Sequence, residues 1–277
     1  MTRSLLPVVA DILREIAVEK VLPRYQALAS GDIEEKAPGD LVTVADHDVE
    51  IALAHRLGAL MPDARFVGEE RCARDPGLLA GLDQGLVWVV DPIDGTGNFA
   101  AGRPPFAIMV ALLRDGVTVA AWIHDPLTGR MAQAELGGGT WIDGRRLQAA
   151  AAAPALAALH GIVSRFAMPE AMVEPVAALE RAIGQATPTQ RCAGHEYPVV
   201  ALGERDFALY WRTLVWDHAA GALILAEAGG VVERLDGTPY RPGSTETGLL
   251  LAHNAATAEI VRSLLRGRGA AIQAIDS

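Results

Sequence analysis

Apolar residues recur at helical spacing twice in the N-terminal part of the chain. The first set consists of Leu5, Leu6, Val9, Ile12, Leu13 and Ile16, and the second runs from about Asp46 through Ile51, Leu53 and Leu57 to Leu60. This spacing predicts two amphipathic helices that pack on a core. Between them, the segment SGDIEEKAPGD at residues 30–40 is rich in Gly, Pro and charge. Such a composition predicts a mobile loop or a hairpin.

A different pattern, typical of β-strands, follows from residue 65 to residue 135. The run VWVV at residues 87–90 is apolar without interruption, which predicts a strand covered on both faces. A shorter strand is predicted at residues 65–68. Residues 106–113 and 117–125 flank an Arg-Asp-Gly turn, and residues 131–135 follow a second turn. These three segments predict an antiparallel meander.

The second half of the chain alternates between strand and helix patterns. It follows the alanine-rich run at residues 149–159, which we interpret as the boundary between a domain at 1–150 and one at 151–277. A strand at 160–164 precedes a helix near 171–184. A clearer helix starts at residue 216, with Asp217 as N-cap and Gly229 at its end. A hairpin around residues 236–237, a strand at 248–252 and a helix capped by Asn254 complete an α/β pattern.

The composition and net charge of the chain exclude several classes of function. The 277 residues are 51% hydrophobic and 21% charged, which is typical of a globular protein. A net charge of −10 argues against binding to nucleic acid or to an anionic membrane surface. Two distant cysteines indicate neither a zinc site nor a disulfide framework, so a cytoplasmic location is expected. The N-terminus has the pattern of an amphipathic helix and not of a secretion signal, and no segment has the length of a membrane span.

The sharpest chemical feature is the segment DPIDGT at residues 91–96, directly after the buried strand. Two carboxylates held this close repel each other unless a cation lies between them, and Mg²⁺ prefers oxygen ligands. Gly95 permits a tight turn, and Thr96 begins a helix whose first N–H groups can bind an anion. A metal ion that carries a phosphate therefore fits the segment. The alternative is that Asp91 and Asp94 only cap the turn.

Four motifs, in this order, resemble those of the inositol monophosphatase family: DLVTVAD at residues 40–46, GEE at 68–70, DPIDGT at 91–96 with Asn98 and Phe99 after it, and WDHAAG at 216–221 followed by EAGG. The resemblance covers most of the chain. It implies a layered sandwich of αβαβα type, lithium-sensitive and Mg²⁺-dependent hydrolysis of phosphate monoesters, and a homodimer.

The resemblance also assigns roles to residues at matching positions. It implies that two or three Mg²⁺ ions are bound by Glu69, Asp91, the carbonyl of Ile93, Asp94 and Asp217. Glu70 is the less favoured alternative to Glu69. Asp46 and Thr96 match the pair that orients and deprotonates the attacking water, although Asp46 also suits a helix N-cap. Asp94, Gly95 and Thr96 are expected to contact the substrate phosphate, and Lys36 is either a loop residue that reaches this site or a solvated lysine.

The chain departs from the family pattern on the substrate side. Tyr210 stands seven positions before Asp217, where family members that act on inositol phosphates have an acidic residue. Ser164 and Arg165 match the end of a family strand, and Arg165 is expected to meet a second phosphate or carboxylate or to form a surface ion pair. His195 is expected either to bind a polar substrate or to hold a loop in place. His218 is expected to pack locally, because imidazole is a poor ligand for Mg²⁺.

The sequence therefore predicts an Mg²⁺-dependent hydrolase of a small phosphate monoester, such as a sugar or alcohol phosphate. Alternative substrates are histidinol phosphate, a 3′(2′),5′-bisphosphate nucleotide and fructose 1,6-bisphosphate. The alternative from another class is a non-catalytic protein that binds metal or a phosphorylated metabolite.

Overall fold

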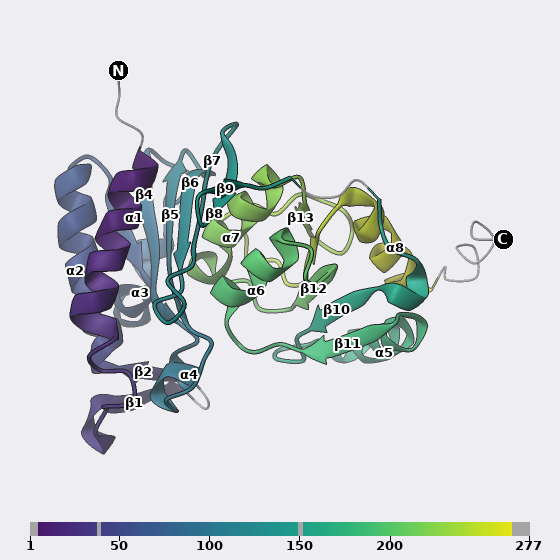
Figure 1. The fold of residues 1–277 in the computed structure, drawn as a ribbon, viewed down its shortest axis with the longest axis horizontal. Helices are drawn as coiled ribbons and strands as arrows, with labels where there is room; N and C mark the ends of the chain where they lie inside the picture. The colour runs from purple at the N-terminus through teal and green to yellow at the C-terminus, as the bar shows by residue number, and fades with distance from the viewer. Residues whose placement is uncertain (1–4, 38–39, 149–151, 268–277) are drawn as a thin grey trace.

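The chain folds into five alternating layers of helices and sheets (Figure 1). A computed structural model describes residues 5–37, 40–148 and 152–267. Helices α1 (Leu5–Ile16) and α2 (Val44–Leu60) cover the outer face of a seven-stranded sheet, and α6 (Ala193–Ala201) and α7 (Val215–Glu227) cover its inner face. A five-stranded sheet follows, with α5 (Val173–Ala182) and α8 (Ala255–Leu265) on its far side. This arrangement confirms the predicted αβαβα class.

The seven-stranded sheet comes entirely from the N-terminal half. Its order is β3 (Arg65–Gly68), β4 (Leu86–Asp94), β5 (Ala107–Arg114), β6 (Val117–His124), β7 (Met131–Glu135), β8 (Gly139–Ile142) and β9 (Arg145–Arg146). Only the β3–β4 pair is parallel, so the predicted meander is confirmed. Gly137 and Gly138 lie at the turn between β7 and β8, and Gly139 begins β8.

The five-stranded sheet comes from the C-terminal half. Its order is β11 (Gln185–Pro188), β10 (His160–Val163), β12 (Phe207–Tyr210), β14 (Leu249–Ala252) and β13 (Val231–Glu233). Strand β10 is parallel to both neighbours, whereas β14 is antiparallel to both of its own. The hairpin predicted around residues 236–237 is reduced to a single bridge between Glu233 and Pro239. The predicted boundary at residue 150 lies outside the described residues.

Several short helices and strands connect or extend the main elements of the fold. Strands β1 (Ile33–Ala37) and β2 (Asp40–Thr43) pair as the hairpin that the sequence allowed. Helix α3 (Glu69–Arg74) starts directly after β3, and α4 (Thr96–Ala100) starts after β4. A π-helical turn (Ala17–Val21) extends α1, and 3₁₀ turns occupy Ser30–Asp32, Pro76–Leu79, Leu156–Ala158 and Glu170–Met172.

Several predictions about helices were wrong in detail. Asp217 is not an N-cap, because α7 begins at Val215 with Leu214 as its N-cap. Asp46 is not an N-cap either: Thr43 caps α2, and Asp46 is the third residue of that helix. Ile51 is 63% exposed, because the buried face of α2 passes through Leu53 and Leu57 instead. The predicted caps Gly229, with φ 98°, and Asn254 are confirmed.

Helix α6 was not predicted at all. Its sequence AGHEYPVVA contains Gly194 and Pro198, two residues that disfavour helix interiors, and almost all of it is buried, so no polar face marks it as amphipathic. Burial against α7 and the sheets offsets the low intrinsic helix propensity of this segment.

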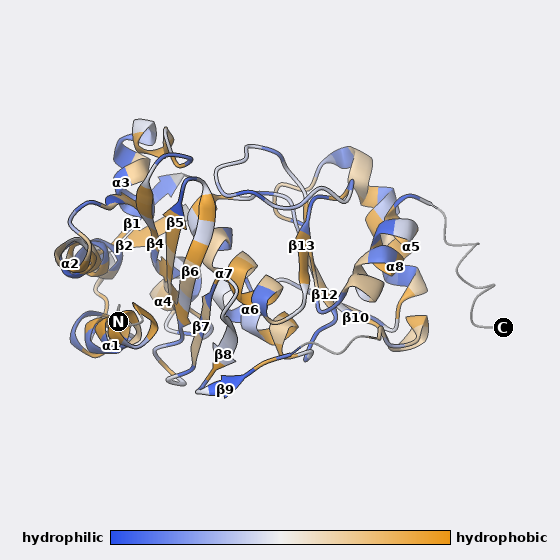
Figure 2. Ribbon diagram, turned by 90° about the horizontal axis from the view of Figure 1, so that it is seen from above, coloured by the Kyte–Doolittle hydropathy of each residue, from blue (hydrophilic) through white to orange (hydrophobic). Residues whose placement is uncertain are grey.

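Hydrophobic residues concentrate along the strands and on the helix faces that meet them, as the hydropathy colouring of the ribbon shows (Figure 2). One buried cluster joins residues of both halves, from Val67 and Met109 on one side to Tyr197, Ala208 and Leu251 on the other.

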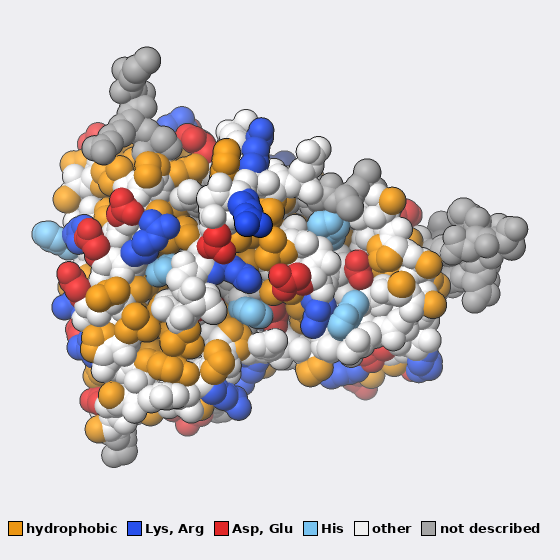
Figure 3. Space-filling view, viewed as in Figure 1, with side chains coloured by type: hydrophobic (Ala, Val, Ile, Leu, Met, Phe, Trp, Pro, Cys, Tyr) orange, Lys and Arg blue, Asp and Glu red, His pale blue; other side chains and the backbone are white. Residues whose placement is uncertain are grey.

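Over the described ranges 5–37, 40–148 and 152–267, none of the helices combines the length and apolar character that crossing a membrane requires. On the face shown in Figure 3, acidic and basic side chains are interspersed.

The packing of α6 on α7 depends on Gly221. A Cβ atom at this position would lie 2.1 Å from the ring of Tyr197, which is fully buried. We therefore expect Gly221→Ala to lower the free energy of unfolding by about 1–3 kcal/mol. Gly58→Ala in α2 is the matched control, since nothing lies within 4 Å of its Cβ, and it should raise stability by up to about 1 kcal/mol. Urea unfolding of both variants measures the difference, and equal midpoints would contradict this packing argument.

Candidate active site

A cleft of about 480 Å³ lies between the end of β4 and the C-terminal half of the chain. All the predicted metal-binding residues line it: Glu69, Asp91, Ile93, Asp94 and Asp217. The predicted substrate residues Gly95, Thr96, Ser164 and Tyr210 also line it. The fold thus brings together acids that lie up to 148 residues apart, from β4, α3 and α7.

A bulge in β4 determines where its two aspartates point. Asp91 pairs with Met109 and Asp94 pairs with Ala107, so three steps along β4 match two steps along β5. In a regular strand, residues three apart face opposite sides of the sheet. The extra residue removes that alternation, and both carboxylates line the same cleft.

Asp94 is held by the start of α6. Its Oδ2 accepts a hydrogen bond of 2.5 Å from the backbone N–H of Gly194, and its carbonyl accepts a 3.6 Å contact from the Cys192 thiol. A Cβ at position 194 would lie 2.8 Å from the Cβ of Ala107, so this approach requires glycine. The helix that sequence reasoning missed therefore orients one of the predicted ligands.

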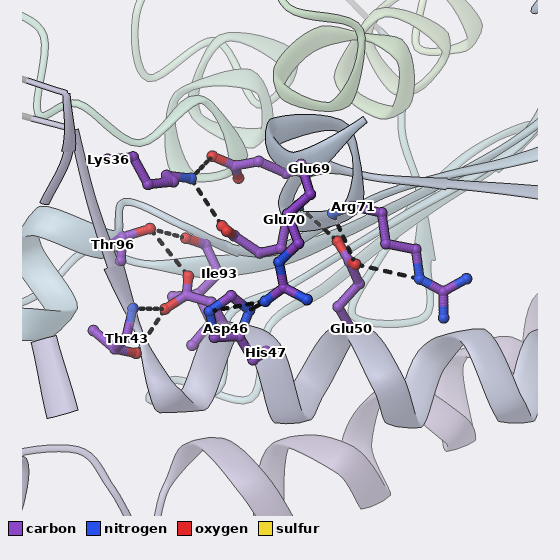
Figure 4. A network of polar contacts seen from close by, with 11 residues as sticks. Lys36, Thr43, Asp46, His47, Glu50, Glu69, Glu70, Arg71, Ile93 and Thr96 are labelled. Atoms are coloured by element: carbon purple, nitrogen blue, oxygen red, sulfur yellow. Dashed lines mark hydrogen bonds and ion pairs between the residues drawn. The ribbon is translucent and has the colours of Figure 1, made fainter. Parts of the chain in front are cut away.

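Asp46 and Thr96 form a hydrogen-bonded pair (Figure 4). Thr96 Oγ1 lies 3.2 Å from Asp46 Oδ1 and 2.9 Å from the carbonyl of Ile93, and it can donate to either. The other carboxylate oxygen of Asp46 accepts hydrogen bonds from the N–H and the hydroxyl of Thr43, at 2.8 and 2.6 Å. Asp46 is fully buried, and this burial raises its pKa to about 7. The Asp46 carboxylate, with its raised pKa, can accept a proton near neutral pH.

Lys36 joins the β1–β2 hairpin to the acids of α3. Its Nζ lies 2.9 Å from Glu69 Oε1 and 2.9 Å from Glu70 Oε1 (Figure 4). Glu69 lines the cleft, whereas Glu70 is almost fully buried behind it. Glu50 fixes the start of α3 by accepting hydrogen bonds from the N–H groups of Glu70 and Arg71. The solvated alternative for Lys36 is therefore wrong in this structure.

The electrostatics of the acid cluster favour a bound cation. Asp91 is 2% exposed, and burial together with the nearby charges of Glu69, Asp94 and Asp217 raises its pKa well above the ordinary value. Burial also raises the pKa of Asp94 to about 7. Asp91 Oδ1 is buried without a hydrogen-bond partner among the described residues. A buried oxygen of this kind needs a partner, and hard divalent cations prefer carboxylate and carbonyl oxygens.

Within the described ranges, no three His, Cys, Asp or Glu side chains already converge as a set that could hold a metal ion. The Lys36 ammonium provides the positive charge next to Glu69 instead. The oxygen donors that line the cleft are of the kind that a hard divalent cation prefers, and Lys36 is bonded to one of them, Glu69.

Two predicted substrate residues do not reach the cleft. His195, on helix α6, lies in a separate small depression with Asp125 and Arg130 and does not line the cleft. Arg165 is bonded to both carboxylate oxygens of Glu180, at 2.8 and 2.7 Å, so its alternative as a surface ion pair is confirmed.

His218 packs locally, as expected. Its Nδ1 lies 3.1 Å from the hydroxyl of Tyr197, and its Nε2 lies 3.2 Å from the carbonyl of Arg212. Burial lowers the pKa of His218 to about 4, so the ring is neutral and can donate one of these bonds while accepting the other.

Sequence reasoning assigned no role to several polar, basic and aromatic residues of the cleft. These are Asn98, Arg103, Phe166, Thr189, Arg191 and Arg212. It also missed that Tyr210 donates its hydroxyl hydrogen to Glu196, a carboxylate buried in α6. Asn98 follows a recognised motif and was the only one with a sequence signal, whereas the others lie in segments without a characteristic spacing.

Comparison with known proteins agrees with this geometry. The model of the inositol monophosphatase family matches residues 3–267. The chain belongs to the inositol monophosphatase family. An inositol-1-monophosphatase of Mesorhizobium japonicum is 34% identical over 210 residues, which are 73% of this chain and 75% of that protein. Escherichia coli Nus factor SuhB is 27% identical over 219 residues, which are 78% and 80% of the two chains.

The fold is shared with solved structures of the inositol monophosphatase family. That of inositol monophosphatase II from Staphylococcus aureus superposes with a TM-score of 0.80 at 24% identity, covering 98% of this chain and 97% of that one. Membership of the inositol monophosphatase family makes the protein a phosphatase that hydrolyses phosphate monoesters, in a family whose enzymes are generally metal-dependent.

Proposed function

We propose that this protein is an Mg²⁺-dependent phosphatase that hydrolyses a small sugar or alcohol phosphate by direct attack of water. The observation that carries the proposal concerns Oδ1 of Asp91, which is buried among Glu69, Asp94 and Asp217 and has no hydrogen-bond partner in the part of the chain that the structure describes. Burial of several like charges is unfavourable in the absence of a cation, so the cluster is built for a state in which a cation is bound.

In the proposed site, Glu69, Asp91, the Ile93 carbonyl, Asp94 and Asp217 hold two or three Mg²⁺ ions. Bound Mg²⁺ neutralises phosphoryl oxygens and lowers the pKa of water. The first N–H groups of α4, at Gly95 and Thr96, face a phosphate, because the start of a helix offers donors without intrahelical acceptors. The left-handed φ of 84° at Gly95 makes this tight approach possible.

Proton transfer is the task of the Thr96 and Asp46 pair. Thr96 accepts a hydrogen bond from the attacking water while its own hydrogen is donated to Asp46, so that the hydroxyl gains the proton of the water as it passes its own to the carboxylate. Asp46 then takes the proton, and the two hydrogen bonds from Thr43 hold the carboxylate in place.

The test is phosphate release from a panel of four compounds, each with Mg²⁺ and with chelator: inositol 1-phosphate, histidinol phosphate, fructose 1,6-bisphosphate and 3′-phosphoadenosine 5′-phosphate. We expect release that requires Mg²⁺, with one preferred compound. If the protein binds Mg²⁺ but releases phosphate from none of them, the proposal of catalysis fails and the non-catalytic binding protein is favoured.

Lys36 provides a separate prediction about the metal. Because its ammonium bonds Glu69 and Glu70, it competes with a cation for the same oxygens. We expect Lys36→Gln to lower the Mg²⁺ concentration that gives half-maximal thermal stabilisation by about fivefold. Lys20, the other lysine of the chain, provides the control Lys20→Gln, which should leave this concentration unchanged. A higher Mg²⁺ requirement in Lys36→Gln would show that Lys36 supports the metal and does not compete with it.

The homodimer, the cytoplasmic location, the sensitivity to lithium and the division into domains at residue 150 stay predictions. Sedimentation of the purified protein tests the first, and phosphate release in the presence of Li⁺ tests the third.

A further inference from the structure

One wall of the cleft is basic, although the protein carries a net charge of −10. Three arginines of the described residues line the cleft: Arg103, which follows α4, and Arg191 and Arg212, which belong to the C-terminal half. The proposed function uses none of them, because it binds the scissile phosphate through metal ions and the start of α4. A basic wall in an acidic protein requires a separate explanation.

Two of these arginines share one aromatic ring. The guanidinium carbons of Arg212 and Arg191 lie 4.9 and 5.6 Å from the ring centroid of Phe166. Phe166 is 47% exposed, which is a large apolar exposure for a residue that lines a cleft. The ring attracts both cations, while the two cations repel each other. An anion bound by both guanidinium groups would remove that repulsion, and the planar guanidinium fork suits phosphate and carboxylate oxygens.

The backbone around Arg191 is fixed by buried groups. Glu196 is 1% exposed and accepts hydrogen bonds from Thr189 Oγ1 at 2.8 Å and from the Gln190 N–H at 2.6 Å. Thr189 Oγ1 in turn accepts a hydrogen bond from the Arg191 N–H at 2.9 Å. Arg191 has a φ of 58°, a left-handed conformation that is unfavourable for a residue other than glycine. Strain of this kind persists where the surroundings hold it, and it is concentrated at functional sites.

The other two arginines are also anchored. The carbonyl of Arg212 accepts a hydrogen bond from the neutral His218, as described above. Arg103 Nε donates to Asn98 Oδ1 at 3.2 Å, and the amide nitrogen of Asn98 donates to the carbonyl of Gln190 at 2.9 Å. The basic wall is thus connected to α4, where the scissile phosphate is expected. Preorganised groups lose less conformational entropy on binding, which is typical of a ligand site.

We infer that the substrate carries a second anionic group, a phosphate or a carboxylate, which Arg191 and Arg212 bind while the scissile phosphate lies at the acid end of the cleft. This inference rests on the proposed hydrolysis of a phosphate monoester. It transfers to Arg191 and Arg212 the role that the sequence suggested for Arg165.

The test compares substrates that differ in one anionic group only. The first pair is 2-phosphoglycerate and glycerol 2-phosphate, in which a carboxylate replaces a hydroxymethyl group. The second pair is 3′-phosphoadenosine 5′-phosphate and adenosine 3′-monophosphate. We expect the wild type to show a kcat/KM at least about tenfold higher for the doubly anionic member of one pair, since hydrogen bonds between charged groups are worth this much or more.

Two variants and a matched control test whether Arg191 and Arg212 cause the preference for the doubly anionic substrate. Arg191→Gln and Arg212→Gln should each reduce kcat/KM for the doubly anionic member by about tenfold, mainly through KM, and leave the singly anionic member within about twofold. Arg165→Gln is the control, because Arg165 is an exposed arginine paired with Glu180 outside the cleft. It should change neither member. Thermal unfolding verifies that all three variants are folded.

The outcomes separate the inference from the proposed function. Mg²⁺-dependent hydrolysis without preference for the doubly anionic members, or an equal loss for both members in the arginine variants, overturns the inference alone. The absence of Mg²⁺-dependent hydrolysis both for these four compounds and for the panel that tests the proposed function overturns the proposed function, and the inference with it.

Discussion

Phosphate release is expected to fall by about a thousandfold or more in Asp91→Asn, because metal ions contribute several kcal/mol to such reactions and each 1.4 kcal/mol is about tenfold in rate. The amide keeps the size of the carboxylate but loses the charge that binds a cation. Asp91 lies at the centre of the cluster, where the charges of Glu69, Asp94 and Asp217 all act on it. Steady-state assays with saturating Mg²⁺ measure the effect.

The Asp91→Asn variant can also be tested by its unfolding temperature with and without Mg²⁺. A purely structural role of Asp91 would not give the result that we expect. Removing one negative charge from a buried acidic cluster relieves repulsion, so in chelator Asp91→Asn should unfold at the same temperature as the wild type or at a higher one. Mg²⁺ should raise the unfolding temperature of the wild type but not that of the variant. The exposed Asp63 provides the control Asp63→Asn, which should leave activity and Mg²⁺ response unchanged. Turnover near the wild-type level in Asp91→Asn would show that the metal assignment is wrong.

Thr96→Val is expected to lower kcat by about a hundredfold to a thousandfold, the contribution typical of a positioned proton acceptor. Valine matches the shape of threonine but cannot accept a hydrogen bond from water or donate one to Asp46. Substrate affinity should change little, because in the proposed site it is the backbone N–H groups that bind the phosphate at this position. Steady-state kinetics with a saturating Mg²⁺ concentration provide the measurement.

Thr96→Ser separates the hydroxyl from the rest of the side chain. It retains the Oγ that lies 3.2 Å from Asp46 and should keep most of the activity. If the serine and valine variants lose activity equally, the hydroxyl is not the group that acts, and the packing of the methyl group accounts for the loss instead.

The sequence predicted the acid end of the cleft better than the opposite wall, for a physical reason. Asp91 and Asp94 follow a buried strand, and charged residues at such a position require a partner, so local pattern alone indicated a site. The bulge that turns both carboxylates into one cleft depends on the pairing of β4 with β5, which no local pattern specifies.

The basic wall depends on contacts across the chain and could not be predicted. Arg191 and Arg212 meet at Phe166 only after three segments come together, and Glu196 reaches Tyr210 from a helix that its own sequence disfavours. His195 was misplaced for the same reason. Without a helix over residues 193–201, no argument could tell which side of the segment faces the substrate.

Helix α7 also limits how the protein can move. It packs on strands β4 to β8 of one sheet and on β13 of the other, and Glu227 at its end accepts hydrogen bonds of 2.8 Å from the N–H groups of Gly137 and Gly139. The two sheets therefore cannot rotate about a hinge without breaking this packing. The β1–β2 hairpin is instead tied to α3 by the two ion pairs of Lys36 with Glu69 and Glu70. We expect access to the acids of α3 to depend on exchanging these ion pairs, and so to respond to ionic strength more than to solvent viscosity.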